Sequence, residues 1–137
     1  MAKGFSTAGV RLERADLPMT PSTLIVGWVY VEKNESAVAA DLRARIVTNI
    51  ENDDGAFIYT EGEEAKLVPG EWTPIVWARN SDVFFWDKGQ ERIPGSERCK
   101  FKNRGNRFSS VEVHFSAIAG PYVGSLYVDE LNFYTVR

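Results

Sequence analysis

The stretch "VEVHFSAIAGPYVGSLYVDELNFY", from Val111 to Tyr134, alternates apolar and polar residues on both sides of a Gly-Pro pair. Its first half places one set of side chains on an apolar face and the other set on a more polar face: Val111, Val113, Phe115 and Ala117 against Glu112, His114, Ser116 and Ile118. A period of two residues is typical of β-strands. The stretch therefore predicts two strands joined by a turn, with the only histidine of the chain on a polar face.

Patterns typical of β-strands extend over most of the chain. Segments rich in β-branched and aromatic residues alternate with turns that contain Gly, Pro or Asn, and they cover 8–14, 22–32, 56–60, 72–78, 82–87 and 98–102. "AVAADLRARIV" (Ala37–Val47) has helix-forming residues, but Leu42, Ala44 and Ile46 alternate with polar residues, so we interpret it as a strand. About nine or ten short strands at this spacing predict an all-β sandwich or barrel.

Composition indicates one folded domain over residues 1–137, because 44% of the residues are apolar and 26% are charged. The net charge of -3 exerts no general pull on nucleic acid or membranes. There is no apolar run of about 20 residues and no secretory leader at the start. We expect a module of a longer secreted protein, a subunit of a virion or a chain that stays where it is made, and no membrane partner.

Aromatic residues make up 12% of the chain and include four tryptophans. Exposed flat rings on a sheet suit carbohydrate, because the apolar faces of pyranose rings stack on them, but aromatic rings also dominate protein cores. Alternation separates Trp72 from Trp77, and Trp77 shares its face with Arg79. The candidates for stacking are Phe57, Tyr59, Trp77 and Trp86, with Arg79 as a hydrogen-bonding neighbour.

The sequence offers few residues that could act together with His114 in catalysis. A catalytic triad lacks a serine in a nucleophile-elbow sequence, and a zinc site would need more His and Cys than one of each. Glycoside hydrolysis needs a pair of placed carboxylates, and no pair stands out. Two interpretations remain, a surface histidine and a ring that holds a polar ligand together with Glu112.

Four segments resemble carbohydrate-binding modules attached to xylanases and β-glucanases. They are Pro18–Val29, "PGEWTP" at Pro69–Pro74, "VHF" at Val113–Phe115 and "VGSLYVDEL" at Val123–Leu131. The last two resemble the closing strand pair of those modules, and the order and spacing also fit from about Val10 to Phe133. The modules usually carry further strands before the position of Val10, so we expect either an incomplete cleft or a fold that another chain completes.

The resemblance implies a jelly-roll β-sandwich of two antiparallel sheets that binds a polysaccharide and has no catalytic activity. By position, His114 matches a cleft histidine, Phe57 or Tyr59 falls near a stacking aromatic, and Glu13 falls near a cleft carboxylate. Asp129 matches an aspartate that often supports a structural calcium ion, although a turn or bulge residue is the competing interpretation. No other cofactor is implied.

The segment "ERCKFKNRGNRF" (Glu97–Phe108) mixes five basic residues with two phenylalanines. Such a mixture can bind single-stranded nucleic acid, but it also suits an acidic glycan, a partner surface or an edge strand protected by charge. We favour the edge strand and disfavour nucleic acid.

The leading hypothesis is a non-catalytic polysaccharide-binding module. The second is a virion subunit, a capsid decoration or tail-fibre component that contacts neighbouring subunits. A small lyase or hydrolase comes last.

Overall fold

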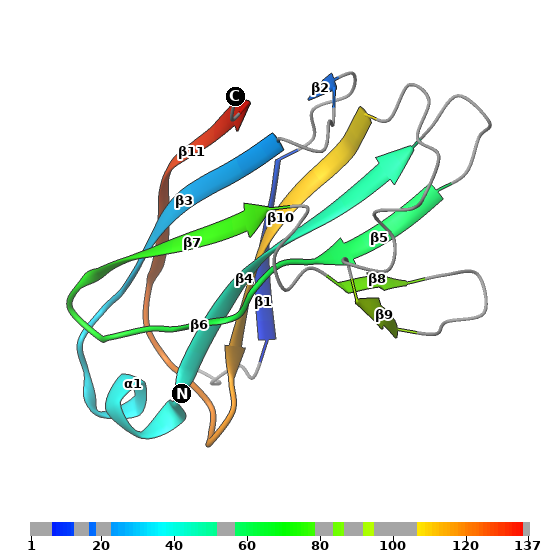
Figure 1. Ribbon diagram of the computed structural model, residues 1–137. Coiled ribbons are helices and arrows are strands. Elements are labelled where there is room, and N and C mark those ends of the chain that lie inside the picture. Colours follow the sequence, from blue (N-terminus) through cyan, green and yellow to red (C-terminus); the bar gives the residue numbers. More distant parts are fainter. Residues whose placement is uncertain are drawn as a thin grey trace.

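The computed structural model describes residues 7–12, 17–18, 23–51, 57–78, 84–86, 92–94 and 107–135. Within them, two antiparallel sheets share one hydrophobic core, and one short helix lies at the end of the molecule (Figure 1). The prediction of an all-β fold is therefore confirmed, and the two sheets are consistent with a β-sandwich.

The larger sheet is built around β10, which pairs with β1 on one side and β4 on the other. Its path runs β1 (Thr7–Leu12), β10 (Arg107–Ala117), β4 (Leu42–Glu51), β5 (Phe57–Glu61), β8 (Phe84–Trp86) and β9 (Arg92–Pro94). Two short strands attach to it, β2 (Leu17–Pro18) to β10 and β6 (Ala65–Lys66) to β4. The strands predicted from the sequence do not include β9, and neither β2 nor β6 is long enough to show a period of two.

The smaller sheet has three strands, β11 (Leu126–Thr135), β3 (Thr23–Val31) and β7 (Trp72–Ala78), with β3 in the middle. Alternate positions of β3 are buried, and the positions between them are half-buried or exposed. The smaller sheet therefore has one face on the core and one face outside it, although both faces of β3 are largely apolar.

The expected pairing of the last two strands is wrong. β10 belongs to the larger sheet and β11 to the smaller one, so the Gly-Pro segment crosses between sheets (Figure 1). Tyr122 is buried in this crossover, and its hydroxyl donates to the carbonyl of Ser125 at 2.7 Å. Alternation shows that a segment is a strand but carries no information about its partner.

A second correction concerns the predicted strand over Ala37–Val47. Its first part belongs to the helix α1 (Glu35–Ala40), and the strand begins at Leu42. The Asn34 side chain caps the helix by accepting the backbone N–H of Ala37 at 2.9 Å. From Leu42 onward the predicted alternation is confirmed, because Leu42, Ala44 and Ile46 are buried while Arg43 and Arg45 are half-buried.

The core forms where the inner faces of the sheets meet. The predicted apolar face of β10 is confirmed, and it packs with the inner faces of β4, β3 and β7: Val111, Val113, Phe115 and Ala117 with Leu42, Ile46, Ile50, Ile25, Val29, Ile75 and Trp77. Burial of so many aliphatic and aromatic side chains stabilises the sandwich, at roughly 25 cal/mol for each Å² of apolar surface removed from water.

Trp77 is in the core, which corrects the prediction that it is a stacking platform. Its exposed fraction is 0%, and its ring meets Phe108 edge-on with centroids 5.4 Å apart. The indole N–H donates to Thr60 Oγ1 at 2.9 Å, and Thr60 Oγ1 lies 2.6 Å from Thr48 Oγ1. Since β7 turns Thr73, Ile75 and Trp77 inward, Trp77 offers no ring face to a ligand.

We expect Trp77→Phe to lower the free energy of unfolding by about 1–3 kcal/mol, because it removes a buried hydrogen bond and leaves a small cavity. The matched control is Trp72→Phe, on the same strand but facing outward, which should change stability by no more than about 0.5 kcal/mol. Urea unfolding followed by circular dichroism measures both. Equal losses in the two variants would contradict the assignment of Trp77 to the core.

Candidate functional site

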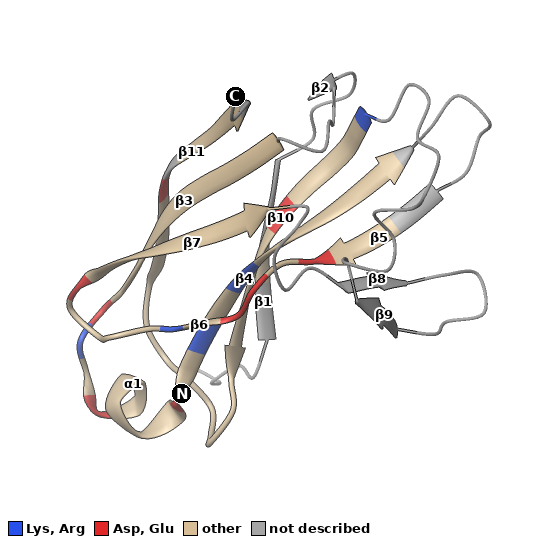
Figure 2. Cartoon of the chain, viewed as in Figure 1, with Lys and Arg blue, Asp and Glu red and all other residues tan. Residues whose placement is uncertain are grey.

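The outer face of the larger sheet gathers three of the predicted ligand-binding residues. Glu112 and His114 project from β10, and Tyr59 projects from β5 on the other side of β4. In register, His114 lies opposite Arg45 and Glu112 lies opposite Val47. All three predicted side chains are half-buried, and Figure 2 shows charged residues along this sheet on β4, β10 and the segment between β5 and β6.

His114 and Glu112 form a hydrogen-bonded pair on this face, with His114 Nε2 and Glu112 Oε2 2.6 Å apart. The backbone of β1 runs beside the ring, since Gly9 is the register partner of His114. A Cβ at Gly9 would lie 3.5 Å from His114 Cδ2, which is ordinary van der Waals contact. The histidine is thus held in place by its own strand and by the neighbouring one, and it keeps an exposed edge.

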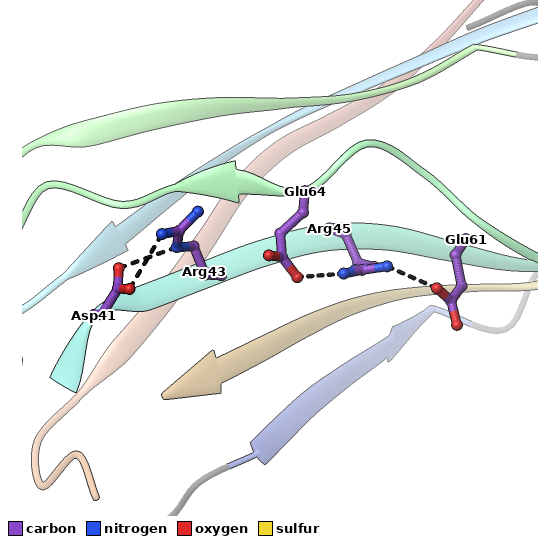
Figure 3. A network of polar contacts seen from close by, with 5 residues as sticks. All are labelled: Asp41, Arg43, Arg45, Glu61 and Glu64. Carbon is purple, nitrogen blue, oxygen red and sulfur yellow. Dashed lines mark hydrogen bonds and ion pairs between the residues drawn. The ribbon is translucent and has the colours of Figure 1, made fainter. Parts of the chain in front are cut away.

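Arg45 is the centre of a polar network that continues along the face (Figure 3). Its guanidinium donates to Glu61 at 2.6 Å and also to Glu64. At the start of β4, Arg43 donates to both carboxylate oxygens of Asp41, at 3.0 and 3.1 Å, and this hydrogen bonding lowers the pKa of Asp41. These contacts fix the directions in which the charged groups point.

Tyr59 is the aromatic side chain of this face that the structure describes. It lies opposite Asn49 of β4 and opposite Trp86 of β8, which brings the main chains of two predicted ligand-binding residues side by side. Burial is the main cause that raises the pKa of Tyr59, and the charges of Glu61 and Glu112 add to it. A face with a tyrosine ring and oriented polar groups can hold a polar ligand that also has an apolar surface.

Four of the predicted residues cannot be placed as side chains. Phe57 and Trp86 lie in β5 and β8, but their side chains are outside the described part of the chain, and Glu13 and Arg79 lie outside it altogether. The same holds for most of the basic segment, of which the structure describes Arg107 and Phe108. Phe108 is a buried core residue.

A second candidate surface, which sequence reasoning missed, lies on the outer face of the smaller sheet. Tyr127 of β11, Tyr30 of β3 and Trp72 of β7 are register partners and form one row across the three strands. The ring centroid of Tyr30 lies 5.4 Å from that of Trp72 and 5.9 Å from that of Tyr127. The corresponding angles between the ring planes are 44° and 56°. The three rings line an open hollow of about 450 Å³.

Further exposed rings lie along the same face, with Trp28 38% and Tyr134 50% exposed. A sequence signal for this surface existed in "TLIVGWVYV", where both alternating sets of residues are apolar. In an antiparallel sheet with one solvated face, the outer set is ordinarily polar. A strand that is apolar on both faces therefore indicates that its outer face binds something other than water.

The chain matches no known protein family, and neither the curated proteins nor the solved structures include one similar to it. The resemblance to the modules of xylanases and β-glucanases thus remains a prediction. None of the helices that the structure describes is long and apolar enough to span a membrane.

The predicted calcium site at Asp129 gains no support from the described residues. Asp129 is exposed on β11, beside a register shift between Asp129 and Asn132. Among the residues that the structure describes, no three of His, Cys, Asp or Glu come together in a group that could hold a metal ion. The position beside a register shift agrees with the competing interpretation, that of a bulge residue.

The raised pKa of Tyr59 predicts a loss of stability in alkali. The unfolded chain releases this phenolic proton near pH 10, whereas the folded chain releases it only at higher pH. The stabilisation is thus complete below about pH 10 and is lost as the pH rises through the folded pKa. We expect Tyr59→Phe to remove one late component from the ultraviolet titration of the tyrosines and to make the alkaline loss smaller. Loss of a component that titrates near pH 10, in place of a late one, would contradict the raised pKa of Tyr59.

Proposed function

We propose that the chain is a non-catalytic module that binds a polysaccharide on the outer face of the larger sheet. The observation that carries the proposal is the gathering of Tyr59, Glu112 and His114 on one face, from two strands separated by β4. The proposal includes the jelly-roll arrangement, which two antiparallel sheets support, and a place outside the cell as part of a larger secreted protein.

The chemistry of the face suits a sugar chain. A pyranose has an apolar C–H face that can stack on the ring of Tyr59, and its hydroxyls can exchange hydrogen bonds with Glu112 and His114. The network of Arg45 with Glu61 and Glu64 holds further acceptors and donors in fixed positions. Because sugar hydroxyls and these polar groups must all lose water on binding, the affinity should be modest.

Ion pairing on this face also argues against a hydrolase. Glu112 is hydrogen-bonded to His114, and Glu61 and Glu64 are both held by Arg45. Carboxylates that are already engaged by a neighbouring side chain serve more readily as fixed acceptors than as a general acid and its partner. The third hypothesis of the sequence, a lyase or hydrolase, thus has less to support it than binding has.

Affinity electrophoresis through gels that contain xylan, mixed-linkage β-glucan, mannan or pectin tests the proposal. We expect one polymer to retard the chain, and His114→Ala to weaken the binding about tenfold, because the hydrogen bonds that the imidazole makes to the ligand and to Glu112 are lost. Tyr59→Ala should weaken it by a similar factor through loss of stacking.

Two matched controls locate the site. Ser116→Ala changes the next outward position of β10 beyond His114, and Tyr134→Ala removes an exposed ring from the opposite sheet. Neither should alter the retardation, provided that urea unfolding shows both variants to be folded. Two outcomes would refute binding on this face. In the first, none of the polymers retards the chain. In the second, Tyr134→Ala abolishes the retardation and His114→Ala does not change it.

A second candidate function is that of an assembly subunit, such as a virion component. It is favoured by the apolar outer face of the smaller sheet, where Trp28 and Tyr134 are exposed. Sedimentation velocity at rising protein concentration separates the two candidates. A monomer throughout agrees with a binding module, whereas an oligomer that Trp28→Ala dissociates would put the assembly subunit first.

A further inference from the structure

From the row of rings on the smaller sheet, we propose that the hollow between Tyr30, Trp72 and Tyr127 binds a small quaternary ammonium cation of the choline type. This inference concerns the opposite side of the sandwich from the polysaccharide face and does not rest on the proposed function.

The first argument is the shape of the hollow. Its three rings come from three adjacent strands and are tilted against one another by 44° and 56°, so their faces do not lie in one plane. Trp72 is 48% and Tyr127 is 51% exposed, so both rings present free surface. Exposed aromatic surface from three rings around one hollow is a surface that a cation with apolar methyl groups can contact through cation–π attraction.

The second argument is charge, because acidic residues flank the row on both sides. Glu32 is exposed, and it continues β3 beyond Val31 as the partner of Ser125, two residues from Tyr30. Its carboxylate accepts the backbone N–H of Ser125 at 3.2 Å. On the other side, Asp129 is exposed two residues beyond Tyr127. Two residues along a strand correspond to about 7 Å, a distance at which physiological salt does not fully screen a charge.

Two more charged residues lie at this end of the smaller sheet. Glu71 is exposed directly before Trp72, and Lys33 is exposed directly after Glu32. The stem of Lys33 lies close to Gly70, where an added Cβ would be 3.4 Å from the Cβ of Lys33. Three carboxylates against one ammonium leave the described surroundings of the hollow acidic, which favours a cation and disfavours an anion.

The third argument separates a quaternary ammonium from a sugar. The hollow is lined by aromatic side chains. A sugar would bring several hydroxyls that need partners in place of water, and unpaired hydroxyls are costly to bury. A trimethylammonium group makes no hydrogen bonds, so it loses none when the rings replace its water. A primary ammonium is less suited, because its three N–H donors would face ring surfaces.

The acidic flanks also restrict the ligand. A cation that carries its own anionic group, such as betaine or phosphocholine, would bring that group towards Glu32 or Asp129. Choline carries a hydroxyl at the same place and has no such repulsion. The hollow should therefore prefer choline to both zwitterions, with a dissociation constant on the order of 1–10 mM, as expected for cation–π contacts on an open surface.

Proton NMR of choline during titration with the intact chain tests this inference. We expect the methyl signal to move upfield and to saturate, because methyl protons over ring faces feel the ring currents. The control ligand is dimethylbutanol, the neutral carbon isostere of choline. It should bind at least roughly fivefold more weakly, because it has the same shape without the charge. Betaine should also bind more weakly than choline.

Variants of the chain assign the effect to the hollow. Trp72→Ala and Tyr127→Ala should each weaken choline binding roughly two- to fivefold. Tyr134→Ala should not, because it removes an exposed ring of β11 that lies outside the hollow. Glu32→Gln keeps an acceptor for Ser125 and should weaken binding, while Glu63→Gln, an exposed carboxylate of the segment between β5 and β6, should not.

Three results would overturn the inference. They are the absence of a saturable shift, equal binding of choline and its neutral isostere, and loss of binding in Tyr134→Ala to the same extent as in Trp72→Ala. Equal binding of the isostere would mean that the hollow recognises apolar shape alone. Polysaccharide retardation is measured separately with the His114 variant, so either proposal can fail while the other stands.

Discussion

The sandwich depends on the side chain of Trp77, which contacts residues of both sheets. Trp77 belongs to β7 of the smaller sheet, yet its indole N–H bonds to Thr60 of β5 and its ring packs edge-on against Phe108 of β10. Thr60 in turn is hydrogen-bonded to Thr48 of β4. Four strands thus meet at one buried side chain, and the polar atom of that side chain is satisfied without water.

Because Trp77 faces inward, the alternate residues of β7 face outward, and one of these is Trp72. The same logic applies on the other side of the core. Burial of Val113 and Phe115 requires His114 to point away from the core, where Glu112 meets it. The core therefore determines both outer faces, and it gives them different chemistry, paired charges around one tyrosine on the larger sheet and a row of tilted rings on the smaller sheet.

The crossover from β10 to β11 is what allows the two sheets to share the C-terminal strands. Asn34 holds it from the side of the helix, since its Nδ2 donates to the carbonyl of Val123 at 2.9 Å while its Oδ1 caps α1. The buried ring of Tyr122 closes the same corner, and Gly124 stands where an added Cβ would lie 2.5 Å from the Tyr122 hydroxyl. The backbone at Gly124 also has φ of 151°, so glycine is required there for two reasons.

The sequence by itself determined the class of the fold and the orientation of individual strands. A period of two sorts side chains between two faces wherever one face is buried, so the outward position of His114 and the inward position of Leu42, Ala44 and Ile46 were predictable. The exact start of β4 was not, because the helical residues before it also fit an alternating pattern and their capping by Asn34 depends on a side chain outside the pattern.

Only the tertiary structure decided which strands are neighbours and which of two apolar faces is the core. β10 and β11 are close in sequence but lie in different sheets, since strand pairing depends on long-range backbone hydrogen bonds that no local pattern records. β7 carries a tryptophan on each face, and the partners Thr60 and Phe108 decided that Trp77 is the buried one. The hollow between Tyr30, Trp72 and Tyr127 likewise required three strands in register, because its residues lie far apart in the chain and meet only in the folded sheet.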